Sequence, residues 1–198
     1  MKLYITVPSP FARKCRIVAR EKGLIGRIEE IAVDPYANAP ELLASNPVVQ
    51  VPTLIAEDGL PLNDSPVICE YLDALGTGPR LLPADGADRL RVRRLETLGA
   101  QALEMGVKLL LELRRPEAEQ SPSWIARWTE NMARALDALE AARPDADRVD
   151  MGVITAGVAV TWVGFRHPGF DLATGRPGLV ALQAALEARP SFVETRPA

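Results

Sequence analysis

With 198 residues, the chain is long enough to bury a sizeable core, either as one large domain or as two small ones. Hydrophobic residues make up 47% and charged residues 25% of it, a balance that excludes a disordered chain. The formal net charge of -3, with basic residues scattered among acidic ones, argues against a nucleic-acid partner.

In chain order, residues 1–76 alternate between strand-like and helix-like segments. Apolar runs predict the strands, and apolar residues at helical spacing predict the helices. We predict strands at 2–7, 28–33, 53–56 and 60–62, and helices at 10–22, 41–45 and 65–75. Asp58-Gly59 suits the tip of a hairpin between the last two strands, because this pair accepts positive φ. The βαβαββα order predicts an α/β layer with a parallel crossover pair followed by an antiparallel pair.

Composition changes after a turn-rich stretch at 77–86, which is typical of a domain boundary. We find no strand pattern from residue 87 onward, and predict helices at 90–113, 123–142, 151–165 and 179–187. The uncharged segment 151–165 is shorter than the roughly 20 residues that a membrane-spanning helix needs, so we expect it at the centre of a helical domain. The densest basic stretch is expected to form a solvated helix face and comprises Arg91, Arg93, Arg94, Arg114 and Arg115.

The two cysteines, Cys15 and Cys69, have neither CxxC spacing nor companion histidines. We therefore expect no disulfide framework and no metal site, and a reducing, cytoplasmic compartment. The amino end has one basic residue and only a short apolar run before proline, unlike a secretory signal. No membrane association is expected.

Three Ser-Pro pairs, beginning at Ser9, Ser65 and Ser121, each stand where a helix is predicted to begin. Serine is a good N-cap and proline suits the first helical position, so each pair is first of all a helix start. Ser9 and Ser65 differ from Ser121 because both follow strands of one sheet, at its carboxyl edge, where α/β proteins commonly bind ligands. Unpaired N–H groups and a partial positive charge make helix N-termini attract anions. Two such ends suit a ligand with two separated negative groups.

The segment V-V-Q-V-P-T, residues 48–53, lies between these two serines. A cis peptide bond between Val51 and Pro52 would turn the N–H and C=O of Val51 toward an extended peptide ligand. An ordinary trans proline that opens an edge strand is the alternative, and the sequence leaves both open.

Three motifs in order resemble the amino-terminal domain of cytosolic-type glutathione S-transferases, in particular bacterial members with a serine-type active site. They are S-P-F-A-R-K at 9–14, N-P-V-V-Q-V-P-T-L at 46–54 and D-S-P-V-I at 64–68. R-P-S-F at 189–192 and the helical second half fit the same family. The resemblance covers nearly the whole chain, and implies a thioredoxin-like domain at 1–76, a linker at 77–86 and an all-helical domain at 87–198. It also implies a homodimer.

The resemblance implies a glutathione site made of Ser9, Gln50, Val51, Pro52, Asp64 and Ser65. Ser9 would hydrogen-bond the thiol, and the backbone of Val51 would pair with the cysteinyl amide beside a cis proline. Ser65 and its helix terminus would take the γ-glutamyl carboxylate, with Asp64 toward the amino group. Gln50 would lie near the glycyl end.

A hydroxyl at position 9 can account for activation of the thiol. A free thiol has a pKa of about 8.5, so only a few per cent is thiolate at neutral pH. Lowering that pKa by about two requires roughly 3 kcal/mol of preference for the anion. A hydrogen bond from Ser9 supplies about 1.5 to 3 kcal/mol and a helix N-terminus about 0.3 to 1. We therefore expect a detoxification-type transferase that conjugates the glutathione thiolate to small electrophilic, largely apolar compounds without a metal.

Other chemistries fit the sequence less well. A nucleophilic serine would need a base, and the single histidine, His167, is expected in a loop or at a helix end. Ser9 cannot form the mixed disulfides that a cysteine there would support, and Cys15 lies too far along the helix to replace it, as a core residue. Tyr4 lies within the first strand and is expected to be structural. Arg13 either adds positive field or belongs to a solvated helix face.

A non-catalytic glutathione-binding or protein-interaction module with the same fold is the alternative function. Met105 and Leu109 are candidates to line the electrophile's pocket, with core packing as the other role. The sequence departs from the family at two places. Val49 stands where glycine is usual, and Asp150 alone remains of a Ser/Thr-x-x-Asp cap before the central helix.

Overall fold

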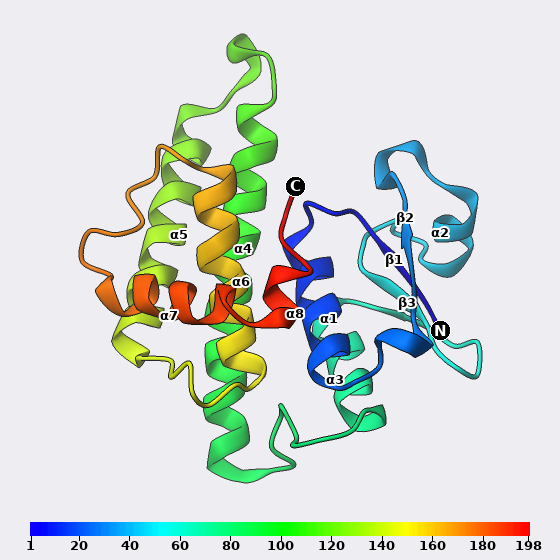
Figure 1. Ribbon diagram of the computed structural model, residues 1–198. Helices are drawn as coiled ribbons and strands as arrows, with labels where there is room; N and C mark the ends of the chain where they lie inside the picture. The colour runs from blue at the N-terminus through cyan, green and yellow to red at the C-terminus, as the bar shows by residue number, and fades with distance from the viewer. The chain divides into compact units, whose positions relative to one another are not determined.

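The computed structural model describes residues 1–198, which form two compact units (Figure 1). The first unit comprises Met1–Leu82 together with Arg189–Ala198, and the second comprises Pro83–Ala188. The chain thus begins in the first unit, builds the second, and returns to the first.

The first unit is built on a four-stranded mixed sheet in the order β2-β1-β3-β4. Its strands are β1 (Lys2–Ile5), β2 (Glu29–Ala32), β3 (Thr53–Ile55) and β4 (Pro61–Asn63). β1 and β2 are parallel, whereas β3 is antiparallel to both β1 and β4. The predicted crossover pair followed by an antiparallel pair is confirmed. The first three strands are one or two residues shorter than predicted, and β4 has the predicted length but is shifted by one residue.

Helices cover both faces of this sheet. They are α1 (Pro10–Glu21), α2 (Pro40–Ser45), α3 (Ser65–Leu75) and α8 (Pro190–Val193), with 3₁₀ turns at η1 (Ile25–Arg27) and η2 (Pro35–Ala37). α1 and α3 lie on one face and α2 on the other (Figure 1). Between α1 and α3, the sulfur atoms of Cys15 and Cys69 lie 3.6 Å apart, and both free thiols are fully buried. The prediction that Cys15 is a core residue is confirmed, and burial raises the pKa of Cys15 well above its usual value.

The carboxyl-terminal segment packs on α1, although the sequence pattern places residues 189–198 with the helical domain. Arg13 donates from Nη2 to the carbonyl oxygen of Phe192 at 3.1 Å, and its guanidinium carbon lies 5.4 Å from the centre of the Phe192 ring. Both side chains are almost completely buried. Arg13 therefore lies inside the first unit, and the prediction of a solvated helix face is wrong for it.

A second set of contacts fastens the same segment to the end of α1. Arg189 and Ser191 both donate hydrogen bonds to the carboxylate of Glu21. Burial tends to raise the pKa of Glu21, but these two donors outweigh it and hold that pKa below its ordinary value. The R-P-S-F ending thus closes the first unit through partners far away in the sequence.

The second unit is entirely helical, as predicted. It comprises α4 (Gly86–Leu113), η3 (Glu117–Glu119), α5 (Pro122–Ala142), α6 (Met151–Arg166) and α7 (Pro177–Glu187). α4 packs against α5 and α6, and α6 is buried over almost its whole length. This confirms the uncharged segment as the central helix. None of the helices combines the length and apolar character needed to span a membrane.

Close approach of α4 and α6 depends on a small residue. A Cβ added to Gly106 would lie 2.8 Å from the ring of Trp162. The carbonyl oxygen of Gly106 lies 2.9 Å from Nε2 of His167, the C-cap residue of α6. Burial lowers the pKa of His167, which favours the neutral ring as a donor to this carbonyl. The histidine is thus a helix-end residue, as predicted.

Candidate functional site

Three strand ends converge at one edge of the sheet in the first unit. β1 and β4 run in the same direction, because each is antiparallel to β3. The register places Tyr4, Thr53 and Asn63 in one row across these strands. Tyr4 is buried within its strand, as predicted for a structural residue. The chain leaves β1 and β4 and enters β3 at this edge, so the segments before and after the row are neighbours.

Ser9 follows β1 at this edge and is the N-cap of α1, as predicted. Its Oγ accepts a hydrogen bond from the N–H of Ala12 at 3.2 Å, and its carbonyl oxygen accepts one from the N–H of Arg13 at 2.9 Å. The side chain of Ser9 is half-buried. Because the hydroxyl acts as acceptor in the cap, its hydrogen remains to be donated to another group.

The peptide bond between Val51 and Pro52, directly before β3, is cis, as the resemblance implies. The N–H and C=O of Val51 make no hydrogen bond to another group of the chain. Gln50, one residue earlier, has an exposed side chain and a carbonyl oxygen that accepts two hydrogen bonds. The peptide group directly before Val51 is therefore held by hydrogen bonds, while the N–H and C=O of Val51 stay available.

The helix α3 begins at Ser65, as predicted, but its capping residue is Asp64 rather than Ser65. The N-cap is Asp64, whose carbonyl oxygen accepts the N–H of Ile68 at 3.1 Å, and Ser65 is the first helical residue. Asp64 has φ 69 and ψ 131, and its exposed side chain makes no capping bond. Ser65 is almost completely buried. The Ser-Pro spelling is shared with Ser9, but here proline occupies the second helical position, so serine cannot serve as the cap.

All six predicted site residues lie at the same edge of the sheet. Ser9 follows β1, residues 50–52 precede β3, and Asp64 and Ser65 follow β4. Met105 and Leu109, the candidates for an electrophile pocket, lie on α4 in the second unit. Leu109 is a buried core residue and Met105 is half-buried.

Sequence reasoning missed one residue that this edge depends on. Asn46 begins the N-P-V-V-Q-V-P-T-L motif, but no role was predicted for its side chain. In the structure its side chain is 1% exposed and makes four hydrogen bonds to the surrounding chain. A polar side chain among apolar ones in the N-P-V-V-Q-V-P-T motif was the available signal.

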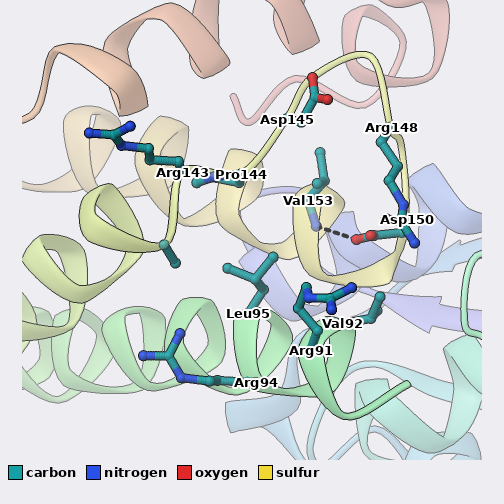
Figure 2. Close-up of a pocket in the computed structure, with 11 residues that line it drawn as sticks. Arg91, Val92, Arg94, Leu95, Arg143, Pro144, Asp145, Arg148, Asp150 and Val153 are labelled. Carbon is teal, nitrogen blue, oxygen red and sulfur yellow. Dashed lines mark hydrogen bonds between the residues drawn. The ribbon is translucent and has the colours of Figure 1, made fainter. Parts of the chain in front are cut away.

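A cavity of about 280 Å³ lies in the second unit, between α4, the end of α5 and the start of α6 (Figure 2). Arg91 and Arg94 line it, and both are exposed, as predicted for a solvated face. Several of its charged side chains have partners within the chain. Arg91 and Arg148 share the carboxylate of Asp88, and Asp150 accepts the N–H of Val153, the dashed line in Figure 2. None of the predicted site residues lies there.

Similarity to known proteins identifies the family of the chain. The family model "Glutathione S-transferase, N-terminal domain" matches residues 8–75. The uncharacterized GST-like protein YibF of Escherichia coli strain K12 is 36% identical over 201 residues, an alignment that spans 100% of this chain and 98% of YibF. The chain belongs to the glutathione S-transferase family.

Solved structures of this family agree with the fold. A glutathione transferase family member from Pseudomonas fluorescens Pf-5, with bound glutathione, superimposes with a TM-score of 0.95 at 31% identity, covering 100% of this chain and 98% of that one. A glutathione S-transferase from Methylobacterium radiotolerans, in complex with glutathione sulfonate, gives 0.91 at 32% identity, over 99% and 94% of the two chains. The predicted glutathione S-transferase fold, a thioredoxin-like domain followed by helices, is confirmed.

Proposed function

We propose that the protein binds glutathione at the carboxyl edge of its sheet and transfers the thiolate to a small electrophilic, largely apolar compound. The observation that carries this proposal is the placement of Ser9 as the N-cap of α1, at the edge where Val51 and Asp64 also lie. We also propose that the enzyme acts as a cytoplasmic homodimer, as the family resemblance implies.

In the proposed complex, Ser9 donates its hydroxyl hydrogen to the glutathione sulfur. A charge-assisted bond of this kind favours the anion by about 1.5 to 3 kcal/mol, and the N-terminus of α1 adds about 0.3 to 1. Together they lower the thiol pKa by about two, so that most of the bound thiol is ionised at neutral pH. The thiol proton leaves to solvent, and the sulfur electron pair forms a bond to the electrophilic carbon. That carbon expels its leaving group with the bonding pair or, in an addition, passes the negative charge to an atom that takes up a proton.

The rest of glutathione is assigned to three neighbouring segments. The N–H and C=O of Val51 pair with the cysteinyl residue, in the manner of an added strand. Ser65 and the N-terminal N–H groups of α3 take the γ-glutamyl carboxylate, because a helix N-terminus favours an anion. Asp64 faces the γ-glutamyl ammonium group, and Gln50 lies toward the glycyl end.

Replacement of Ser9 tests the central step. We expect Ser9→Ala to raise the pKa of the bound thiol by about one to two, with a smaller effect on glutathione affinity. The measurement is thiolate absorbance against pH at saturating glutathione. Ser9→Thr keeps the hydroxyl and should keep the pKa, and Asp150→Ala, which removes the side-chain cap of α6, controls for loss of an N-cap. Equal pKa values for wild type and Ser9→Ala would exclude the role given to Ser9.

A conjugation assay over a panel of electrophiles tests transfer itself. We expect turnover with apolar electrophiles that is first order in enzyme. Glutathione binding without turnover on any member of the panel would contradict the transferase and indicate a binding module.

A further inference from the structure

Asn46 is the one buried side chain that ties together two of the segments assigned to glutathione. We propose that Asn46 is a positioning residue, which holds the loop at 48–52 and the end of β4 in the geometry that binds glutathione. This inference rests on the proposed function and adds a residue that does not itself touch the ligand.

The donor side of the Asn46 amide fixes the loop. Nδ2 donates to the carbonyl oxygen of Gln50 at 3.1 Å and to Oγ1 of Thr53 at 3.0 Å. The hydroxyl of Thr53 donates in turn to the same Gln50 carbonyl at 2.8 Å. Two donors therefore hold the peptide that leads directly into Val51, whose own N–H and C=O remain free of partners in the chain.

The acceptor side of the same amide reaches the neighbouring strand. Oδ1 accepts the N–H of Val48 at 3.1 Å and Nδ2 of Asn63 at 3.4 Å. Asn63 is the last residue of β4 and directly precedes Asp64. One side chain thus links the segment assigned to the cysteinyl residue with the segment assigned to the γ-glutamyl group.

The chemistry of the group explains why asparagine is needed. A carboxamide has two N–H donors and two acceptor lone pairs, and all four are used here. Aspartate would lack the donors, and an apolar residue would leave buried polar groups of the loop unsatisfied. The loop has no regular strand pairing of its own, and Val49 within it adopts φ 52, a conformation that is unfavourable for a valine. Without Asn46 the loop should populate other conformations.

The expected consequence is a loss of affinity with little change in reactivity. When only a fraction of the protein is competent to bind, the apparent dissociation constant rises by the inverse of that fraction. If removal of Asn46 leaves about a tenth of the molecules competent, the dissociation constant rises about tenfold. Ser9 makes no hydrogen bond to this network, so the thiol pKa in the saturated complex should stay as in wild type.

The experiment compares wild type with Asn46→Ala by calorimetric titration of reduced glutathione, well below the unfolding temperature. We expect the dissociation constant to rise about tenfold and the thiol pKa at saturation to be unchanged. Asp73→Asn is the matched control. Asp73 is equally buried in the same unit and accepts the N–H groups of Leu81 and Leu82 together with Nζ of Lys22. The Asp73→Asn variant should be less stable to heat than wild type but should bind glutathione with the same affinity.

Thr53→Val keeps the experiment decisive if Asn46→Ala does not fold. It removes one of the two donors to the Gln50 carbonyl and should raise the dissociation constant by a smaller factor, about threefold. Wild-type affinity in both variants would overturn this inference alone, as would an equal loss of affinity in Asp73→Asn. A wild-type protein that binds no glutathione would overturn the proposed function and this inference with it.

Discussion

Val49 is a strained residue beside the candidate site. Its φ of 52 lies in the left-handed region, where a β-branched side chain clashes with its own backbone. Its N–H nevertheless bonds to the carbonyl oxygen of Asn46 at 2.9 Å, so the surrounding loop holds it there. Strain of this type costs about 1 to 3 kcal/mol.

We predict that Val49→Gly stabilises the protein. Glycine adopts positive φ without penalty, and its extra flexibility in the unfolded chain costs about 0.5 to 1 kcal/mol, less than the strain removed. The expected net gain is about 1 kcal/mol in the free energy of unfolding, measured by urea denaturation. Val48→Gly is the control, because Val48 is exposed and has negative φ, and it should lose stability. Equal losses in both variants would contradict strain at Val49.

At the scale of single residues, the sequence predicted what local chemistry decides. Ser9 is the expected N-cap because serine and proline together specify that position. The cap of α3 was misplaced by one residue because Asp64 can also end a strand and start a helix. Asn46 and Arg13 were missed for another reason. Their partners are set by tertiary packing, which no local pattern encodes.

Among the elements, α6 has a single capping side chain. Oδ1 of Asp150 accepts the N–H of Val153 at 2.9 Å, as predicted from the shortened cap motif. Burial is the main influence on this carboxyl and raises its pKa above 3.8, with nearby Glu96 adding to the effect. Hydrogen bonds from the backbone act in the opposite direction and only partly offset burial.

We predict that Asp150→Ala lowers the free energy of unfolding by about 1 kcal/mol, because the cap is lost. Asp150→Ser keeps a capping oxygen without burying a charge. Since the pKa of Asp150 is raised on folding, its contribution to stability is full below about pH 3.8 and is lost as pH rises through the folded pKa. Wild type should therefore lose stability relative to Asp150→Ser as the pH rises above about 4, as followed by denaturation midpoints. Identical pH profiles for the two proteins would contradict the burial argument.

The elements themselves were predictable because apolar periodicity is long and regular in this chain. α4, α5 and α6 follow their predicted spans closely, and the strands were recognised despite being only three or four residues long. The short 3₁₀ turns and α8 were not predicted. A helical segment of three or four residues makes only about one turn, so it is too short to show a helical period of apolar residues.

For the molecule as a whole, the decisive feature is that its first unit is discontinuous in sequence. Residues 1–82 and 189–198 are separated by the entire helical unit, yet they share one core. The sequence pattern predicted only one domain boundary, at the turn-rich stretch 77–86, because a change of composition indicates where a chain leaves a domain. It does not mark where the chain comes back, and here the return is made by Phe192 and its neighbours on α8.

We predict that Phe192→Ala destabilises the first unit and spares the second. Phe192 is fully buried, so its truncation should cost about 3 to 5 kcal/mol, whereas Val193→Ala, at a side chain 43% exposed, should cost less than about 1. Hydrogen exchange read by mass spectrometry can assign the loss to a unit. Amides of α1, whose Arg13 lies over the Phe192 ring, should exchange faster in Phe192→Ala, and amides of α6 should keep their protection. Protection is lost first where packing is lost. Faster exchange in α6 with α1 unchanged would therefore contradict the assignment of the carboxyl-terminal segment to the first unit.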